Sequence, residues 1–139
     1  MTVITKTEAE AVLRRWLRSQ KYEVSKLRVL GETGVDLIAR RGEETLYIEV
    51  IGYSSKGPKR ARDFFEAFFR AISRLKDGAG FCIIAMPREY SRGLKKRAAR
   101  YGVAWRRIGT AFPELSSWLV DCRPGACAVE VFVWNSWLE

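Results

Sequence analysis

The order of predicted elements along the chain is helix, three strands, helix, strand, helix, strand, which predicts an α/β fold with a mixed central sheet flanked by helices. Apolar residues recur at helical spacing in the helical segments, and alternating or continuously apolar runs lie between them. A helix separates the fourth and fifth predicted strands, so the right-handed crossover rule makes these two strands parallel. The 139 residues suit one domain, 1–139, with an aromatic C-terminal extension over 110–139.

The first half of the chain is predicted to form one helix and three strands. Residues 7–20 place their apolar side chains on one helical face, and Thr7 with Glu10 has the spacing of a capping box. Gly42 lies in a tight turn between the second and third strands. The predicted strands are 22–30, 35–41 and 45–51.

The middle of the chain alternates between helices and strands. Residues 59–76 form the most strongly patterned helix, with a broad apolar stripe rich in phenylalanine. Residues 81–86 are continuously apolar, which is typical of a buried central strand. A basic helix is predicted over 89–101, and a further strand over 103–108.

Two conformations are open for the tail. Residues 117–122 and 128–134 are predicted to form a hairpin about Pro124-Gly125. Alternatively, residues 113–120 form a short helix that leads into one last strand. Exposed aromatic residues mark interfaces, so the tail is a candidate element of a homodimer, unless it packs on its own sheet. The tryptophans of this segment are Trp118, Trp134 and Trp137.

Three cysteines and the absence of histidine restrict the chemistry. A His-dependent triad is excluded, and a structural zinc site is not expected. Cys82 lies in an apolar run and is expected to be buried. Cys122 and Cys127 could face each other across a hairpin, although a disulfide is not expected in a cytoplasmic protein. We expect a cytoplasmic location and no membrane partner, because the sequence lacks a signal peptide and an apolar run of about 20 residues.

The positive charge is concentrated in the middle of the chain. The net charge is +9, and residues 51–110 hold fifteen Lys and Arg against four Asp and Glu. Such a basic region indicates a polyanionic partner, most simply nucleic acid. The alternative is a basic surface that is only solvated.

Two carboxylates lie on predicted apolar strands. With a turn centred on Gly42-Glu43, Asp36 and Glu49 are cross-strand neighbours whose Cβ atoms lie about 5 Å apart. Carboxylates this close repel each other unless a cation lies between them, and Mg²⁺ or Mn²⁺ suits oxygen ligands of this kind. The backbone carbonyl of Val50 and the side chain of Glu10 are candidates to complete the metal site.

Each of these carboxylates has a simpler alternative role. Asp36 could cap a turn or pair with Arg40 or Arg41, and Glu49 has a similar structural alternative. Glu10 could serve only in the capping box.

Three motifs together resemble the PD-(D/E)XK nuclease superfamily, over residues 8–108. They are Ala9-Glu10 in the first helix, Gly-Val-Asp-Leu-Ile-Ala at 34–39, and Tyr-Ile-Glu-Val-Ile-Gly at 47–52. The resemblance implies a restriction-endonuclease-like αβββαβ core and Mg²⁺-dependent hydrolysis of phosphodiester bonds, with DNA as the expected substrate. It gives Asp36 and Glu49 the metal-binding catalytic roles. Many resolvases of this fold are dimers, which favours a homodimer.

The chain departs from the family pattern at one position. Ile51 stands where the resemblance places a lysine that activates the attacking water and stabilises charge on the phosphate. Lys56 and Lys59 are the candidates to supply that amine, with Lys56 predicted as catalytic. The alternative is a nuclease-fold protein that has lost catalysis and acts as a nucleic-acid-binding or dimeric interaction module.

Basic residues beside the proposed site and on the helix over 89–101 are candidates for contacts with nucleic acid. Such contacts would be made to phosphates and would not depend on base sequence. The candidates are Lys56, Lys59, Arg60 and Arg62 beside the site, and Lys95, Lys96 and Arg97 on the helix.

Overall fold

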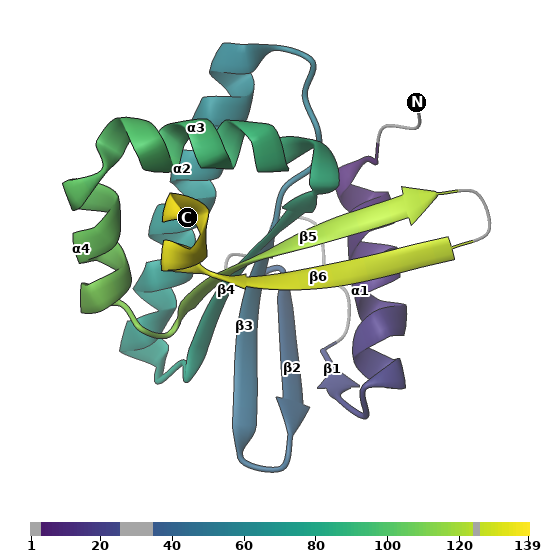
Figure 1. Ribbon diagram of the computed structural model, residues 1–139. Coiled ribbons are helices and arrows are strands. Elements are labelled where there is room, and N and C mark those ends of the chain that lie inside the picture. Colours follow the sequence, from purple (N-terminus) through teal and green to yellow (C-terminus); the bar gives the residue numbers. More distant parts are fainter. Residues whose placement is uncertain (1–3, 26–34, 124–125) are drawn as a thin grey trace.

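The computed structural model describes residues 4–25, 35–123 and 126–139, which form a six-stranded mixed sheet with helices on both sides (Figure 1). The strands are β1 (Glu23–Val24), β2 (Leu37–Arg41), β3 (Glu44–Val50), β4 (Phe81–Pro87), β5 (Leu115–Arg123) and β6 (Ala126–Val133). The helices are α1 (Lys6–Ser19), α2 (Gly57–Ser73), α3 (Ser91–Tyr101) and α4 (Val103–Ala111), with short 3-10 helices η1 (Arg74–Asp77), η2 (Arg88–Tyr90) and η3 (Trp134–Leu138). The predicted α/β class with a mixed sheet is confirmed.

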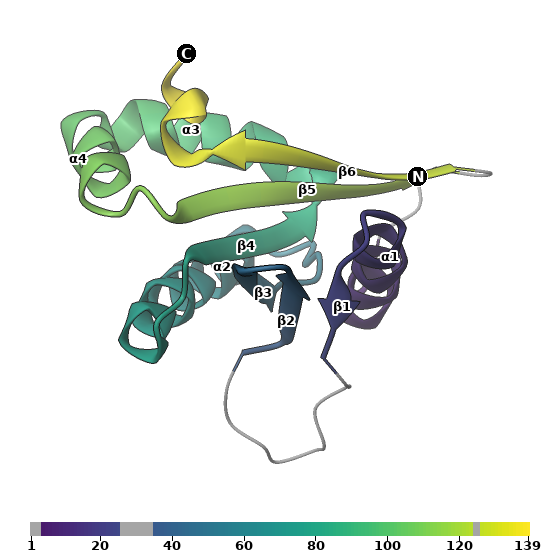
Figure 2. The ribbon, with the colours of Figure 1, turned by 90° about the horizontal axis from the view of Figure 1, so that it is seen from below.

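The six strands lie in the sheet in the order in which they occur along the chain. The β1–β2, β2–β3 and β5–β6 pairs are antiparallel, whereas β3–β4 and β4–β5 are parallel. Figure 2 shows α1 on one side of the curled sheet and α2 on the other. None of the helices in the described part of the chain is long and apolar enough to cross a membrane.

The alternation of side chains along β3 divides the core in two. Leu46, Ile48 and Val50 belong to the apolar cluster beneath α1. Ile51, which follows the strand, is buried in the other cluster, and Tyr47 packs against it, beneath α2, α3 and α4. Glu49 has the parity of Tyr47 and Ile51, so the sheet places it on the α2 side.

The first helix starts one residue before its predicted boundary, and its capping box is formed by other residues. Thr5 is the N-cap: its hydroxyl accepts a hydrogen bond from Glu8 N at 3.2 Å, and the Glu8 carboxylate accepts one from Thr5 N at 3.4 Å. The predicted Thr7 and Glu10 box is therefore wrong. Buried Ile4 precedes this cap and belongs to the same apolar cluster as Ala9, the two positions that a hydrophobic staple uses, which favours a helix that starts at Lys6.

The predicted strand over 103–108 is wrong, because this segment is α4. Gly102, with φ of +44°, ends α3 and allows the chain to turn. The Trp105 ring then stacks on that of Trp134 at 4.0 Å between centroids, and each indole N–H donates to the other residue's carbonyl oxygen at 3.0 and 2.8 Å. The strand that lies parallel to β4 is β5, which starts at Leu115.

The tail forms the predicted hairpin, β5 with β6, and the alternative helix over 113–120 is wrong. The turn residues Pro124-Gly125 lie outside the described residues. Trp118 and Trp134 are buried, so the tail packs on its own sheet and does not expose these tryptophans as an interface.

The first predicted strand, 22–30, is observed only at Glu23–Val24, because residues 26–34 lie outside the described part.

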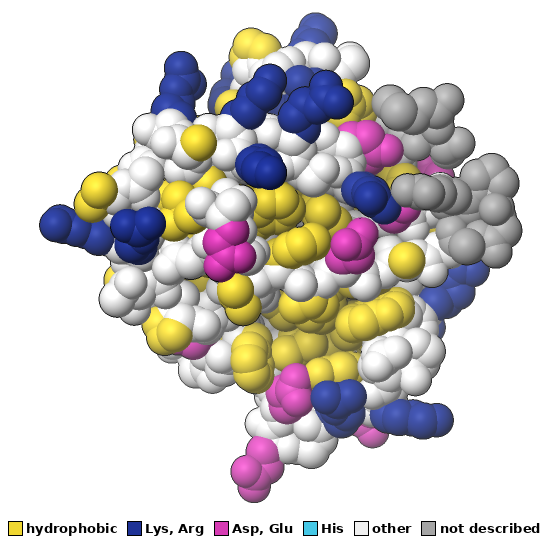
Figure 3. Space-filling view, viewed as in Figure 1, with side chains coloured by type: hydrophobic (Ala, Val, Ile, Leu, Met, Phe, Trp, Pro, Cys, Tyr) yellow, Lys and Arg dark blue, Asp and Glu magenta, His cyan; other side chains and the backbone are white. Residues whose placement is uncertain are grey.

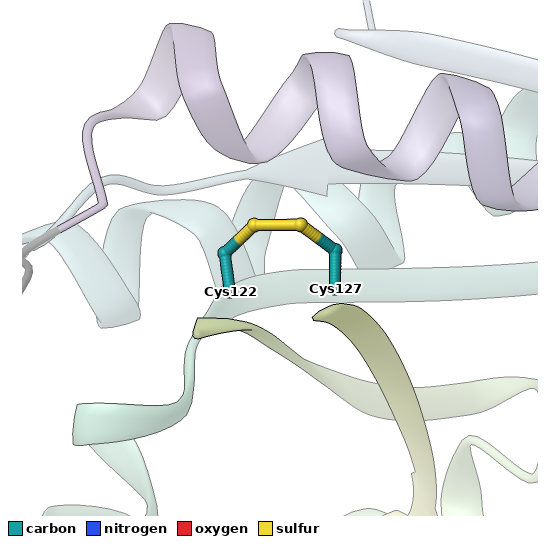
Figure 4. Close-up of a disulfide and its surroundings, with 2 residues drawn as sticks. All are labelled: Cys122 and Cys127. Carbon is teal, nitrogen blue, oxygen red and sulfur yellow. A yellow bond between two sulfur atoms is a disulfide. The ribbon is translucent and has the colours of Figure 1, made fainter. Parts of the chain in front are cut away.

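The hairpin carries a disulfide that the sequence did not predict. Cys122 and Cys127 are register partners on β5 and β6, and their sulfur atoms are bonded (Figure 4). The two cysteines face each other across the hairpin, as the sequence allowed, and the expectation that they form no disulfide is wrong. Cys82 is buried and free, as predicted.

Candidate functional site

Asp36 and Glu49 lie beside each other where β2 begins and β3 ends. Leu37 pairs with Ile48 in the antiparallel register, so the residue before Leu37 stands opposite the residue after Ile48. Only 7% of Asp36 and 2% of Glu49 is exposed. The two side chains are joined by a hydrogen bond between their carboxyl groups. The adjacency that the sequence predicted is therefore present in the structure.

This environment raises the pKa of Glu49 from 4.5 to about 7. Burial is the largest cause, followed by the charge of Asp36 and the hydrogen bond to that residue; the charges of Arg70 and Arg74 act in the opposite direction. Near neutral pH the pair therefore holds one proton for much of the time. This shared proton removes the repulsion that two ionised carboxylates would exert on each other at a buried location.

The two carboxyl groups differ in their other contacts. Asp36 Oδ2 accepts a hydrogen bond from the backbone N–H of Val50 at 2.9 Å. Glu49 Oε1 is buried and has no hydrogen-bond partner among the described residues. Buried carboxylate oxygens are nearly always hydrogen-bonded or bound to a cation. The Glu49 oxygen thus marks a location where a ligand would relieve an unfavourable desolvation.

Lys6 is a residue of the site that sequence reasoning missed. Its Nζ atom lies 3.1 Å from Asp36 Oδ1. Lys6 is the first residue of α1, where a cation is disfavoured by the helix dipole. A lysine at the start of a helix was therefore the one feature of the sequence that indicated an anionic partner for Lys6 elsewhere in the fold.

The segment that follows β3 brings Lys6 to Asp36. Tyr53 N donates a hydrogen bond to Ile4 O at 3.3 Å. A Cβ atom added at Gly52 would lie 2.6 Å from the backbone nitrogen of Lys6, so only glycine permits this approach. The start of α1 therefore packs directly against the chain that leaves the site.

Ile51 occupies a position in the core. Its side chain is buried in the cluster beneath α2, and its N–H donates to Ala85 O at 2.9 Å. The position at which the resemblance expects a lysine is therefore filled by an apolar contact.

The structure does not unite the other predicted metal ligands with the pair. The described residues contain no group of three or more His, Cys, Asp or Glu side chains that could hold a metal ion. Glu10 lies one turn after Lys6 on α1 and is not part of the capping box, so its role as a ligand stays a prediction. Val50 contacts Asp36 through its N–H group, and the predicted role of its carbonyl as a metal ligand stays a prediction.

The basic residues at the start of α2 have contacts of their own. Lys59 pairs with Asp63 at 2.8 Å. The Arg60 guanidinium donates to Ser54 O at 2.7 Å and lies over the Tyr53 ring. Lys56 and Arg62 are exposed. The lysine that the structure places against Asp36 is thus on α1 rather than in this segment.

The basic helix predicted over 89–101 corresponds to η2 and α3, and its basic residues divide into two kinds. Lys95 and Lys96 are exposed, and basic side chains gather over α3 and near α4 on the face shown in Figure 3. The Arg97 guanidinium instead lies over the rings of Phe64 and Phe65, at 5.4 and 5.9 Å from their centroids. Burial lowers the pKa of Arg97. Arg97 therefore packs α3 against α2, whereas the two lysines face solvent.

Comparisons with known proteins do not place the chain in a family. The sequence matches no family model and no curated protein. The geometry around Asp36 and Glu49 is therefore the basis for assigning a function.

Proposed function

We propose that this protein is a metal-dependent endonuclease that hydrolyses phosphodiester bonds of nucleic acid, with DNA as the expected substrate. The observation that carries the proposal is the buried pair of Asp36 and Glu49, in which Glu49 Oε1 has no hydrogen-bond partner among the described residues. The order α1-β1-β2-β3-α2-β4 supports it, because it follows the αβββαβ order of the restriction-endonuclease-like core.

The donor set suits a hard divalent cation. Asp36 and Glu49 supply carboxylate oxygens, and Mg²⁺ typically binds one or two carboxylates while it keeps several waters. When bound there, Mg²⁺ or Mn²⁺ would lower the pKa of a coordinated water and neutralise charge on the phosphate. The Val50 carbonyl and Glu10 remain the proposed additional ligands. The exposed Lys56 and Arg62 are the proposed contacts to neighbouring phosphates.

The test is cleavage of plasmid and branched DNA by purified protein with Mg²⁺ or Mn²⁺ and with EDTA. We expect cleavage that requires the ion and is lost in Asp36→Asn and Glu49→Gln, which keep the side-chain shape. Glu43→Gln is the matched control, since Glu43 is exposed in the turn between β2 and β3. Circular dichroism establishes that each variant folds. Cleavage that persists in Asp36→Asn would show that the activity comes from a contaminant.

The second candidate is a nucleic-acid-binding protein without hydrolytic activity, which is favoured by the burial of Ile51. This candidate predicts DNA binding that weakens with salt, is accompanied by no cleavage, and is unchanged in Asp36→Asn. Fluorescence anisotropy with the same DNA distinguishes it from the nuclease.

A homodimer remains part of the proposal, formed by the same tail over 110–139 but through its exposed valines rather than its buried tryptophans. Trp118 and Trp134 are buried, whereas Val131 and Val133 on β6, the last strand of the sheet, are 54% and 66% exposed. Sedimentation equilibrium of the full chain and of Val133→Asp tests this surface. Dissociation in the variant is expected, and a wild-type monomer at all concentrations would contradict the dimer.

A further inference from the structure

We infer that Lys6 supplies the amine that the site lacks at Ile51, and that it stabilises the negative charge on the phosphate during hydrolysis. This inference rests on the proposed endonuclease activity and names the residue that completes its site. It replaces Lys56, the candidate indicated by the sequence.

The first argument is the position of the amine. Lys6 Nζ lies 3.1 Å from Asp36 Oδ1, and the Asp36 side chain is 4% exposed whereas that of Lys6 is 43% exposed. The amine therefore stands between a buried carboxylate and solvent. An ammonium group has three N–H donors, so one can bind Asp36 while the others face a phosphate that approaches from the solvent side.

The second argument is the rigidity of the segment that carries Lys6. Reciprocal hydrogen bonds between Thr5 and Glu8 fix the start of α1. The close approach at Gly52 and the Tyr53 N to Ile4 O hydrogen bond then hold that start against the end of β3. A catalytic group needs such support, because its contribution falls steeply when it is misplaced by about 1 Å.

The third argument is the charge at this location. A lysine at the first position of a helix is opposed by the helix dipole, and the free energy of its pairing with Asp36 must offset this. The negative charge of Asp36 alone would repel a phosphate that approaches from solvent. The more exposed ammonium group of Lys6 places a positive charge between Asp36 and that phosphate. The arrangement thus attracts an anion to the metal ligands.

The chemistry assigned to Lys6 requires no proton from its amine. In hydrolysis, a water oxygen bonds to phosphorus and one P–O ester bond breaks. The water loses a proton to solvent, and the departing oxygen gains one from solvent. Lys6 donates hydrogen bonds to the non-bridging oxygens, on which negative charge develops. Because a preorganised donor of this kind acts mainly in the transition state, its removal should lower the rate rather than the affinity for DNA.

The experiment compares single-turnover cleavage by the full chain and by its variants, with the protein in excess over DNA. Lys6→Met removes the amine, Lys6→Gln keeps one hydrogen-bond donor for Asp36, and Lys6→Arg keeps the charge. Lys56→Met tests the sequence-based candidate. Lys76→Met is the matched control, because Lys76 is exposed on η1 and has no assigned role. Anisotropy gives the affinity for DNA, calorimetry gives the affinity for Mn²⁺, and thermal unfolding verifies the fold.

We expect Lys6→Met and Lys6→Gln to lower the single-turnover rate by about 100-fold, the effect of removing one transition-state donor. Affinities for DNA and Mn²⁺ should change by no more than a few fold, and Lys6→Arg should recover part of the rate. Lys56→Met should alter the affinity for DNA, and Lys76→Met should resemble the wild type.

Two results would overturn the assignment while leaving the nuclease intact. One is a wild-type rate in Lys6→Gln, the variant with the better prospect of a normal fold. The other is a reduced rate in all three Lys6 variants that follows a decrease in Mn²⁺ affinity or thermal stability, since Lys6 would then be structural. A wild-type protein that cleaves neither plasmid nor branched DNA would instead overturn the proposed function, and the role of Lys6 with it.

Discussion

At the residue scale, Glu49 couples the fold to pH. Its pKa in the folded protein is about 7 against an ordinary value of 4.5, because the side chain is buried beside Asp36. Between these two values the folded protein keeps a proton that the unfolded chain has released. The folded state binds more protons, so the contribution of Glu49 to stability falls as pH rises from about 4.5 to about 7 and stays low above that.

Replacing Glu49 with glutamine should remove this dependence, because an amide resembles the protonated acid at every pH. We expect Glu49→Gln to match the wild type near pH 4.5 and to exceed its free energy of unfolding at pH 8 by up to about 3 kcal/mol. Urea unfolding in EDTA at the two pH values measures the difference, with Glu43→Gln as the control. A gap between Glu49→Gln and the wild type that does not widen with pH would contradict the raised pKa.

The same proton should compete with a metal ion. A cation bound by both carboxylates requires Glu49 to be ionised, so binding releases a proton below pH 7. We expect Mn²⁺ to bind more tightly, and to raise the melting temperature more, at pH 8 than at pH 6. Isothermal titration calorimetry in buffers of different ionisation enthalpy counts the protons released. Equal Mn²⁺ affinity at the two pH values would argue against coordination by Glu49.

At the scale of elements, the site depends on how α1 meets the end of β3. The helix carries Lys6, the strand carries Glu49, and Gly52 sets the distance between them. At 2.6 Å, an added Cβ would overlap the backbone nitrogen of Lys6, which cannot move without shifting the whole helix start. The position of the amine relative to Asp36 is therefore a property of this contact between elements.

Gly52→Ala should lower the free energy of unfolding by about 1–3 kcal/mol, the usual cost of overpacking. It should also lower the cleavage rate more than Gly80→Ala does. Gly80 is a suitable control because an added Cβ there meets nothing closer than Thr45 O at 3.8 Å. Urea unfolding and single-turnover assays measure the two effects. A Gly52→Ala protein as stable and as active as Gly80→Ala would show that the approach of α1 is not tight.

At the scale of the whole molecule, the excess of positive charge lies on the elements that follow β3. Residues 51–110 hold fifteen of the 25 Lys and Arg residues, and they include α2, α3 and α4. Arg97 is engaged with aromatic rings, whereas Lys95 and Lys96 on α3 are exposed. Lys95 and Lys96 are therefore accessible to a phosphate backbone, as are the exposed Arg92 and Arg100 of the same helix.

The double variant Lys95→Ala/Lys96→Ala should weaken DNA binding to a similar degree for all base sequences. The slope of log affinity against log salt should become shallower by about 0.9 for each phosphate that the variant no longer neutralises. Arg15→Ala/Arg18→Ala is the matched control, because it removes the same charge from exposed positions on α1. Anisotropy at several salt concentrations measures both slopes. Identical slopes in the two double variants would show that net charge alone matters and that α3 does not touch the DNA.

The sequence by itself determined the features that short-range patterns encode. Helical spacing predicted α1, α2 and the basic α3, and the continuous apolar run predicted β4. Asp36 and Glu49 were predictable as neighbours because a tight turn joins their strands and fixes the register. For the tail, the turn residues predicted a hairpin, but the sequence left a short helix over 113–120 equally open, and the pairing of β5 with β6 decided between them.

Only the tertiary structure decided which distant segments meet. The segment 103–108 has apolar residues that suit either a strand or a helix, and the burial of Trp105 against Trp134 selects the helix. Lys6 reaches Asp36, thirty residues away, because Gly52 lets α1 approach the end of β3. Such contacts join elements that share no local pattern, so they depend on how the two apolar clusters pack the helices onto the sheet.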